Sequence, residues 1–233
     1  MQGSRSGLEE QTRPSSGRSG MRSERIGETL FEQRLRIELQ QLVRPRHARW
    51  DAFGLLELAK RWSASPPERP VWLVAFDKEE WGMIGSRALA QELRQQEQPL
   101  RLMVSLEMLG YTSLQQRYPQ EEIREGFGDC GDFIALVANN DAAHLLPVLG
   151  RDMGTHVCTK VLPVPLRGEQ MPEVRLSDHS PFWDAGYNAV MVTETSFMRN
   201  PHYHQPTDTI EALDLPFLMA VINGLEFAIG KLT

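Results

Sequence analysis

Two adjacent glutamates, Glu79 and Glu80, directly follow an apolar run in the sequence VWLVAFDKEEWGMIG. Such a pair can divide the work of a hydrolytic site, because one carboxylate can bind a metal ion while its neighbour accepts and returns a proton. For an isolated Glu-Glu pair the simpler interpretation is an exposed loop, since acidic side chains are mostly solvated. The other segments that carry reactive groups therefore decide between the two interpretations.

Three later segments of the chain also carry side chains that could bind a metal ion or transfer a proton. Glu107 lies near the end of the apolar run Leu100–Leu109, where a buried carboxylate is costly unless a cation balances it. Asp178 begins a new segment, SDHSPFWDAGY, in which its local alternative is to cap a helix. A polar segment near the carboxyl end contains His202 and His204. Carboxylate oxygen and imidazole nitrogen are the ligands that zinc accepts, so these groups could form a metal site.

The elements around these groups indicate how they could meet. Val71–Phe76 has the length and β-branched or aromatic content of a buried strand, and Gly82 and Gly85 mark the turn into a helix. Functional groups in open α/β sheets lie beyond the carboxyl ends of the strands. The other expected elements are strands over Leu100–Leu109, Asp132–Val137 and Asn188–Glu194, helices over Trp50–Trp62, Met83–Gln95, Asp141–Arg151 and Leu213–Leu232, and a proline-broken loop over Lys160–Pro172. This alternation predicts a three-layer α/β sandwich around a mostly parallel sheet.

The amino-terminal part has a different character. Residues 1–20 are almost devoid of large apolar side chains, so we expect them to be disordered. Glu24–Val43 carries apolar residues near helical spacing and is predicted to be a helix that Pro45 ends. Residues 1–45 are thus expected to form an extension that precedes the α/β domain.

Composition limits the functional classes. At 233 residues the chain can form one sizeable α/β domain and an extension, and its net charge of −6 argues against a nucleic-acid surface. No run of about 18 apolar residues predicts a membrane span, and the amino terminus lacks the apolar core of a signal peptide, so the cytoplasm is the default expectation. Cys130 and Cys158 could form one disulfide, although two unpaired thiols are favoured.

Four segments resemble, in order, the motifs of the zinc-dependent aminopeptidase family that contains bacterial leucyl aminopeptidases and, more distantly, glutaminyl cyclases. They are FDKEEWGMIGS at 76–86, SLEMLGY at 105–111, SDHSPFWDAGYNAVMVTET at 177–195 and NPHYHQPTDT at 200–209. The resemblance extends over about Leu55 to Leu232. It implies a three-layer α/β fold, a peptide substrate, two zinc ions and hydrolysis of the amino-terminal peptide bond.

The resemblance also implies a role for each matching residue. Glu79 matches the general base, Glu80 a zinc ligand, and Glu107 the acidic ligand of the second zinc. His204 matches the closing imidazole ligand, and Asp178 a carboxylate that lies near the site without binding the metal directly. His202 is expected to be a structural or rim residue. His179 could support the site from behind the ligands or simply pack in the core, and packing is favoured.

Two ligands of the family have no counterpart in this chain. One is a histidine in a His-x-Asp segment, and the other is an aspartate that bridges both metals in an Asp-Asp-x-Ala-Ser-Gly turn. The bridging position falls at about Arg46, in the sequence RPRHARWDAFG, where His47 and Asp51 are the nearest stand-ins. Residues 46–233 are therefore expected to form an incomplete domain, lacking amino-terminal strands of the family, with one zinc ion or none and little or no activity.

Three functional readings follow from the resemblance. The family activity is aminopeptidase hydrolysis. The alternatives are a catalytically inactive, peptidase-like binding module and a glutaminyl-peptide cyclotransferase. The amino-terminal segment itself is either natural or the product of a shifted reading frame or a wrong start.

Overall fold

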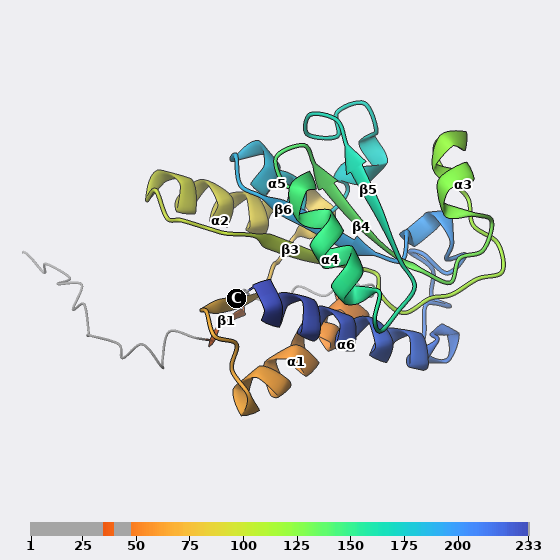
Figure 1. Ribbon diagram of the computed structural model, residues 1–233, viewed down its shortest axis with the longest axis horizontal. Helices are drawn as coiled ribbons and strands as arrows, with labels where there is room; N and C mark the ends of the chain where they lie inside the picture. Colours follow the sequence, from red (N-terminus) through yellow and green to blue (C-terminus); the bar gives the residue numbers. More distant parts are fainter. Residues whose placement is uncertain (1–34, 40–47, 233) are drawn as a thin grey trace, which may run out of the picture.

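A computed structural model describes residues 35–39 and 48–232, with side chains described from Ala52 onward (Figure 1). Its larger sheet has the strand order β3-β6-β4-β5. The strands are β3 (Met103–Glu107), β4 (Ile134–Asn139), β5 (Thr159–Val164) and β6 (Ala189–Thr193). The pairs β3–β6 and β4–β5 are parallel, and only β4–β6 is antiparallel. The mostly parallel α/β sheet predicted from the sequence is confirmed.

Helices cover both faces of this sheet. They are α1 (Ala48–Ala64), α2 (Ile84–Gln95), α3 (Glu121–Phe127), α4 (Leu146–Met153), α5 (His179–Asp184) and α6 (Leu215–Leu232). Alternate residues of β4 point to opposite faces, so Ile134 and Leu136 join the core formed with α1, α4 and α6, whereas Ala135 and Val137 join the core formed with α2 and α5. Figure 1 shows the resulting three layers.

A second, two-stranded parallel sheet pairs β1 (Leu35–Leu39) with β2 (Val71–Ala75). The prediction of a helix over Glu24–Val43 is therefore wrong for residues 35–39. In LRIEL, apolar and charged residues alternate with a period of two, which suits a strand paired with a neighbour better than a helix face. The rest of the predicted helix and the disorder expected for residues 1–20 fall outside the described residues.

The loop predicted over Lys160–Pro172 is also wrong at its start, because Thr159–Val164 forms strand β5. Pro163 led to that prediction, since proline has no N–H to donate to a sheet. However, β5 is the terminal strand of the sheet order, and edge strands tolerate proline. The short helix α3 had no counterpart among the predicted elements.

Helix α6 has the length and apolar character of a membrane span. The mean hydropathy over Leu215–Leu232 is 1.5, and 39% of this window is buried inside the fold. The core helix of a globular domain meets the same criteria, and α6 contributes Phe217, Leu218, Val221, Ile222 and Leu225 to the core shared with α1 and α4. Packing thus accounts for the apolar residues on the buried face of α6.

The two cysteines lie just before neighbouring strands, Cys130 ahead of β4 and Cys158 ahead of β5. Both are free thiols, as favoured from the sequence. No crosslink therefore contributes to the stability of the described part of the chain, which depends on the two packed cores.

Candidate active site

A tight turn positions the two glutamates after β2. Glu79–Trp81 forms a single 3₁₀ turn, and its backbone is closed by hydrogen bonds from the N–H groups of Gly82 and Met83 to the carbonyl of Glu79, at 3.0 and 2.7 Å. Lys78, Gly82 and Met83 all have left-handed backbone conformations, with φ of 52°, 96° and 56°. Such a conformation is strained for Lys and Met, and strain of this kind concentrates at functional sites.

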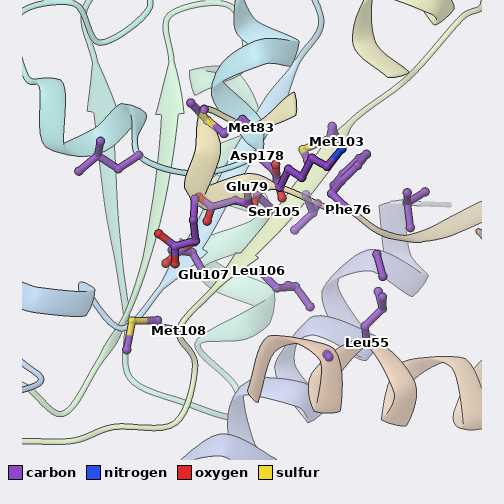
Figure 2. Close-up of a pocket in the computed structure, with 18 of the residues that line it drawn as sticks. Leu55, Phe76, Glu79, Met83, Met103, Ser105, Leu106, Glu107, Met108 and Asp178 are labelled. Atoms are coloured by element: carbon purple, nitrogen blue, oxygen red, sulfur yellow. The ribbon is translucent and has the colours of Figure 1, made fainter. Parts of the chain in front are cut away.

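The predicted site residues converge on one pocket. A cavity of about 350 Å³ is lined by Glu79, Glu80, Glu107 and Asp178, which come from the ends of β2 and β3 and from the start of α5. Figure 2 shows Glu79, Glu107 and Asp178 among the residues that line this cavity. His204 reaches the same group, because its Nε2 lies 3.1 Å from Oε1 of Glu80. All five predicted residues are therefore brought together.

The crowding of carboxylates gives the pocket an unusual electrostatic character. Burial, reinforced by the negative charges of Glu107, Asp178 and Glu80, raises the pKa of Glu79 to about 9. Burial also raises the pKa of Asp178 to about 6, and Oδ1 of this residue has no hydrogen-bond partner among the described residues. A pocket that forces carboxyl groups toward the neutral form is suited to holding a cation or exchanging protons.

The segment after β6 supplies the aromatic side chains at one side of the pocket. Tyr203 lines the cavity, and its ring stacks on that of His204 with centroids 3.9 Å apart. His204 has a left-handed backbone, with φ of 57°. His202 points elsewhere, because its Nδ1 lies 2.9 Å from the hydroxyl of Thr207 and its ring packs edge-on against Tyr111. This placement agrees with the structural role expected for His202.

Sequence reasoning missed a buried network of polar groups in the segment after β6. Glu194 follows β6 and accepts a hydrogen bond from the backbone N–H of Tyr111, while Arg199 donates from Nε to Gln116 and from Nη1 to the carbonyl of Phe133. Glu194 and Arg199 are only 1% and 4% exposed. A carboxylate at the end of an apolar run was the signal that singled out Glu107, and the same signal is present at Glu194.

Comparison with known proteins agrees with this geometry. The sequence profile described as Peptidase family M28 matches residues 52–225, about three quarters of the chain. The chain belongs to peptidase family M28. Within curated sequences, the M28 domain is 32% identical over 180 residues to the uncharacterized protein YfbL of Escherichia coli K12. That alignment covers 74% of this chain but only 54% of YfbL, so the chain spans about half the length of this relative.

Solved structures share the fold at low sequence identity. The Legionella pneumophila LapA aminopeptidase superposes with a TM-score of 0.58 at 20% identity, covering 84% of this M28 chain and 50% of LapA. The Porphyromonas gingivalis glutaminyl cyclase gives 0.54 at 12% identity, covering 86% and 73% of the two chains. The gamma-secretase component nicastrin gives 0.56 at 14% identity, covering 85% and 39%. At these identities the likeness establishes the fold.

The described residues do not complete a zinc site. Glu80 and His204 are adjacent and could supply two ligands, but a catalytic zinc normally has three protein ligands. Across the described side chains, no three His, Cys, Asp or Glu groups are placed to share one metal ion. Of the two stand-ins considered from the sequence, His47 and the side chain of Asp51 both lie outside this described set. The described side chains thus bring two candidate ligands together, and no reaction step is assigned to a metal.

His179 packs in the core, as expected from the sequence. Its side chain is fully buried, its Nε2 donates to the carbonyl of Val174 at 2.8 Å, and its ring meets Trp183 edge-on with centroids 4.3 Å apart. Burial lowers the pKa of His179 to about 3, because the charged imidazolium would lose its hydration. This residue therefore supports the start of α5 beside Asp178 and stays neutral.

Neutral His179 makes the fold sensitive to acid. Its folded pKa of about 3 lies below the unfolded value of 6.5, so the unfolded chain binds a proton first and stability falls as the pH drops below 6.5. Between pH 7 and pH 5 we expect this residue to remove about 2 kcal/mol from the free energy of unfolding. Urea titrations at both pH values should show a pH dependence smaller by that amount in a His179→Gln variant. Equal pH dependence in the two proteins would show that His179 is not buried in the neutral form.

Proposed function

We propose that this chain is part of a peptidase-type hydrolase that acts on the amino-terminal bond of peptide substrates. The observation that supports the proposal is the convergence of Glu79, Glu80, Glu107 and His204 on one pocket at the carboxyl ends of β2 and β3. Membership of family M28 and the likeness to the LapA aminopeptidase give the reaction class. The substrate is an extended peptide whose amino terminus enters this pocket.

Each residue has a proposed part in this function. Glu79 is the proton-transfer group, because it is the carboxyl group with the largest rise in pKa and it faces the centre of the pocket. Glu80 and His204 form one side of a zinc site, with Glu107 directed at the same space. Asp178 lines the same cavity, and its negative charge contributes to raising the pKa of Glu79.

The same geometry leads us to propose that the chain alone is hydrolytically silent. Two ligands are too few to hold a catalytic zinc firmly at neutral pH. We expect no hydrolysis of leucyl, alanyl or methionyl chromogenic amides above a zinc-only blank, with zinc in excess. Zinc-dependent turnover that is lost in a Glu79→Gln variant would contradict this expectation and would show that a further ligand outside the described residues completes the site.

A cyclotransferase is the second candidate. One observation favours it: the chain covers 73% of the P. gingivalis glutaminyl cyclase, against 50% of LapA. The two reactions are distinguished by adding a peptide with amino-terminal glutamine and following ammonia release, since hydrolysis of the aminoacyl amides releases none. If neither substrate reacts in the presence of zinc, the remaining alternative of a binding module, also open from the sequence, is the one supported.

A further inference from the structure

A second cavity separates β2 from β3. It has a volume of about 440 Å³ and is lined along one side by Val71–Val74 of β2. Leu102 and, from β3, Met103, Val104 and Leu106 line the other side. These two strands belong to different sheets and are not hydrogen-bonded to each other. The cavity therefore lies between the edges of the two sheets, where one added strand would join them into a single sheet.

The cavity also reaches both helical layers. Leu58 of α1 and Ile229 of α6 line it on one face, and Leu93 of α2 and Phe182 of α5 line it on the other. A strand in this position would direct alternate side chains toward the two layers. Because both layers present apolar groups, a strand that fills the cavity must be apolar on both faces.

One edge of β3 faces this cavity and is paired with none of the strands in the part of the chain that the structure describes. The N–H of Met103 donates to the carbonyl of Asn188, at 2.9 Å, on the side of β6. Backbone groups of successive residues in a strand point to opposite edges, so the N–H and C=O groups of Val104 and Leu106 point away from β6. β3 ends the sheet order on that side, and none of the described strands pairs with this edge. Unpaired backbone groups in an apolar surrounding are unfavourable, so the edge requires partners.

We propose that this slot binds an extended, apolar peptide segment as an added β-strand between β2 and β3. A small apolar ligand could fill the volume, but it would leave the N–H and C=O groups of Val104 and Leu106 without partners. A segment of about five residues matches the lengths of β2 and β3. The matched relatives have the length to supply such a strand, because the chain spans only 54% of YfbL and 50% of LapA. The proposed occupant is a segment supplied by another polypeptide.

The test uses the full chain and a seven-residue probe with five alternating valines and isoleucines between terminal lysines. Amide hydrogen exchange is measured with and without the probe. We expect exchange at Val104 and Leu106 to slow at least tenfold, while the amide of Ser105, which already faces β6, changes little. The matched control is the same peptide with its five central amides N-methylated, which keeps the apolar side chains and removes the donors.

Substitutions in β3 provide a second readout. Val104→Pro removes an N–H that faces the slot and leaves the bonds to β6 in place, so the affinity for the probe should fall at least tenfold. The control variant Val104→Ala keeps that N–H, so its affinity for the probe should stay within a few-fold of that of the unaltered chain. If the proline variant does not fold, the comparison of the two peptides on the unaltered chain still decides. Equal binding of the N-methylated peptide would overturn the proposal. Slow exchange at Val104 and Leu106 in the absence of the probe would also overturn the proposal. If that slow exchange does not depend on protein concentration, a segment of this chain fills the slot. If it becomes slower as the concentration rises, a second copy of the chain fills it.

Discussion

Replacing Arg199 with leucine is expected to lower the free energy of unfolding by roughly 3–5 kcal/mol. The guanidinium donates to Gln116 and to the carbonyl of Phe133, at 2.8 and 2.9 Å, and lies 4.6 Å from the centre of the Phe133 ring. Burial lowers the pKa of Arg199 to about 10 and raises that of Glu194 to about 8, so burial outweighs the attraction between them. Leucine would leave the Gln116 side chain and the Phe133 carbonyl without this buried donor, and would remove a positive charge that lowers the pKa of Glu194.

Two control variants separate charge from hydrogen bonding at this position. Arg199→Lys keeps the positive charge but loses the forked donors, so its destabilisation in urea titrations should be smaller than that of the leucine variant. Adding Glu194→Gln to Arg199→Leu should cost less than the sum of the two single changes, because either single change already removes the interaction between the two groups. A loss below about 1 kcal/mol in Arg199→Leu would mean that the network does not hold the segment after β6 in place.

A Glu79→Gln variant is expected to be more stable than the unaltered chain by about 3 kcal/mol at pH 7. The folded pKa of about 9 lies above the ordinary value of 4.5 for a glutamate, so the stability contribution of protonated Glu79 is complete below pH 4.5 and is lost as the pH rises toward 9. Glutamine keeps the neutral state at every pH. The gain should therefore be large at pH 7 and close to zero at pH 4.

The matched control for this gain is Glu122→Gln on the exposed surface of α3. Surface substitutions of this kind change stability by less than about 0.5 kcal/mol. Urea titrations of the three proteins at pH 4 and pH 7 give the comparison. A Glu79→Gln variant that is less stable than the unaltered chain at pH 7 would contradict this expectation. It would show that Glu79 is charged at pH 7 and that nearby groups stabilise its negative charge.

The convergence of the site could be predicted because it depends on strand ends. Glu79, Glu80 and Glu107 follow apolar runs, and the parallel arrangement of strands places such ends together. His204 could be placed only through the resemblance to the peptidase family, since a loop histidine carries no periodic signal. The helical layers were likewise predicted correctly, because α1, α2 and α6 have strong amphipathic or apolar patterns.

Other parts of the structure could not be predicted, for physical reasons. In β1 the pairing with β2 overrides residues whose composition favours a helix, and in β5 the position at the sheet edge makes Pro163 harmless. The slot between β2 and β3 depends on which strands pair, which no local pattern specifies. The network of Glu194 and Arg199 was overlooked because its partners, Tyr111, Gln116 and Phe133, are distant in sequence.

Glu80 and His204 are proposed to form one side of a cation site that the described residues leave incomplete. The most direct test of this proposal is the zinc affinity of the chain, measured by competition with a chromogenic chelator and repeated with Glu80→Ala and His204→Ala. We expect a dissociation constant for zinc in the micromolar range or above, and a loss of affinity of at least tenfold in either variant. Binding that is unchanged in both variants, or tight enough to survive dialysis in both, would contradict the proposal.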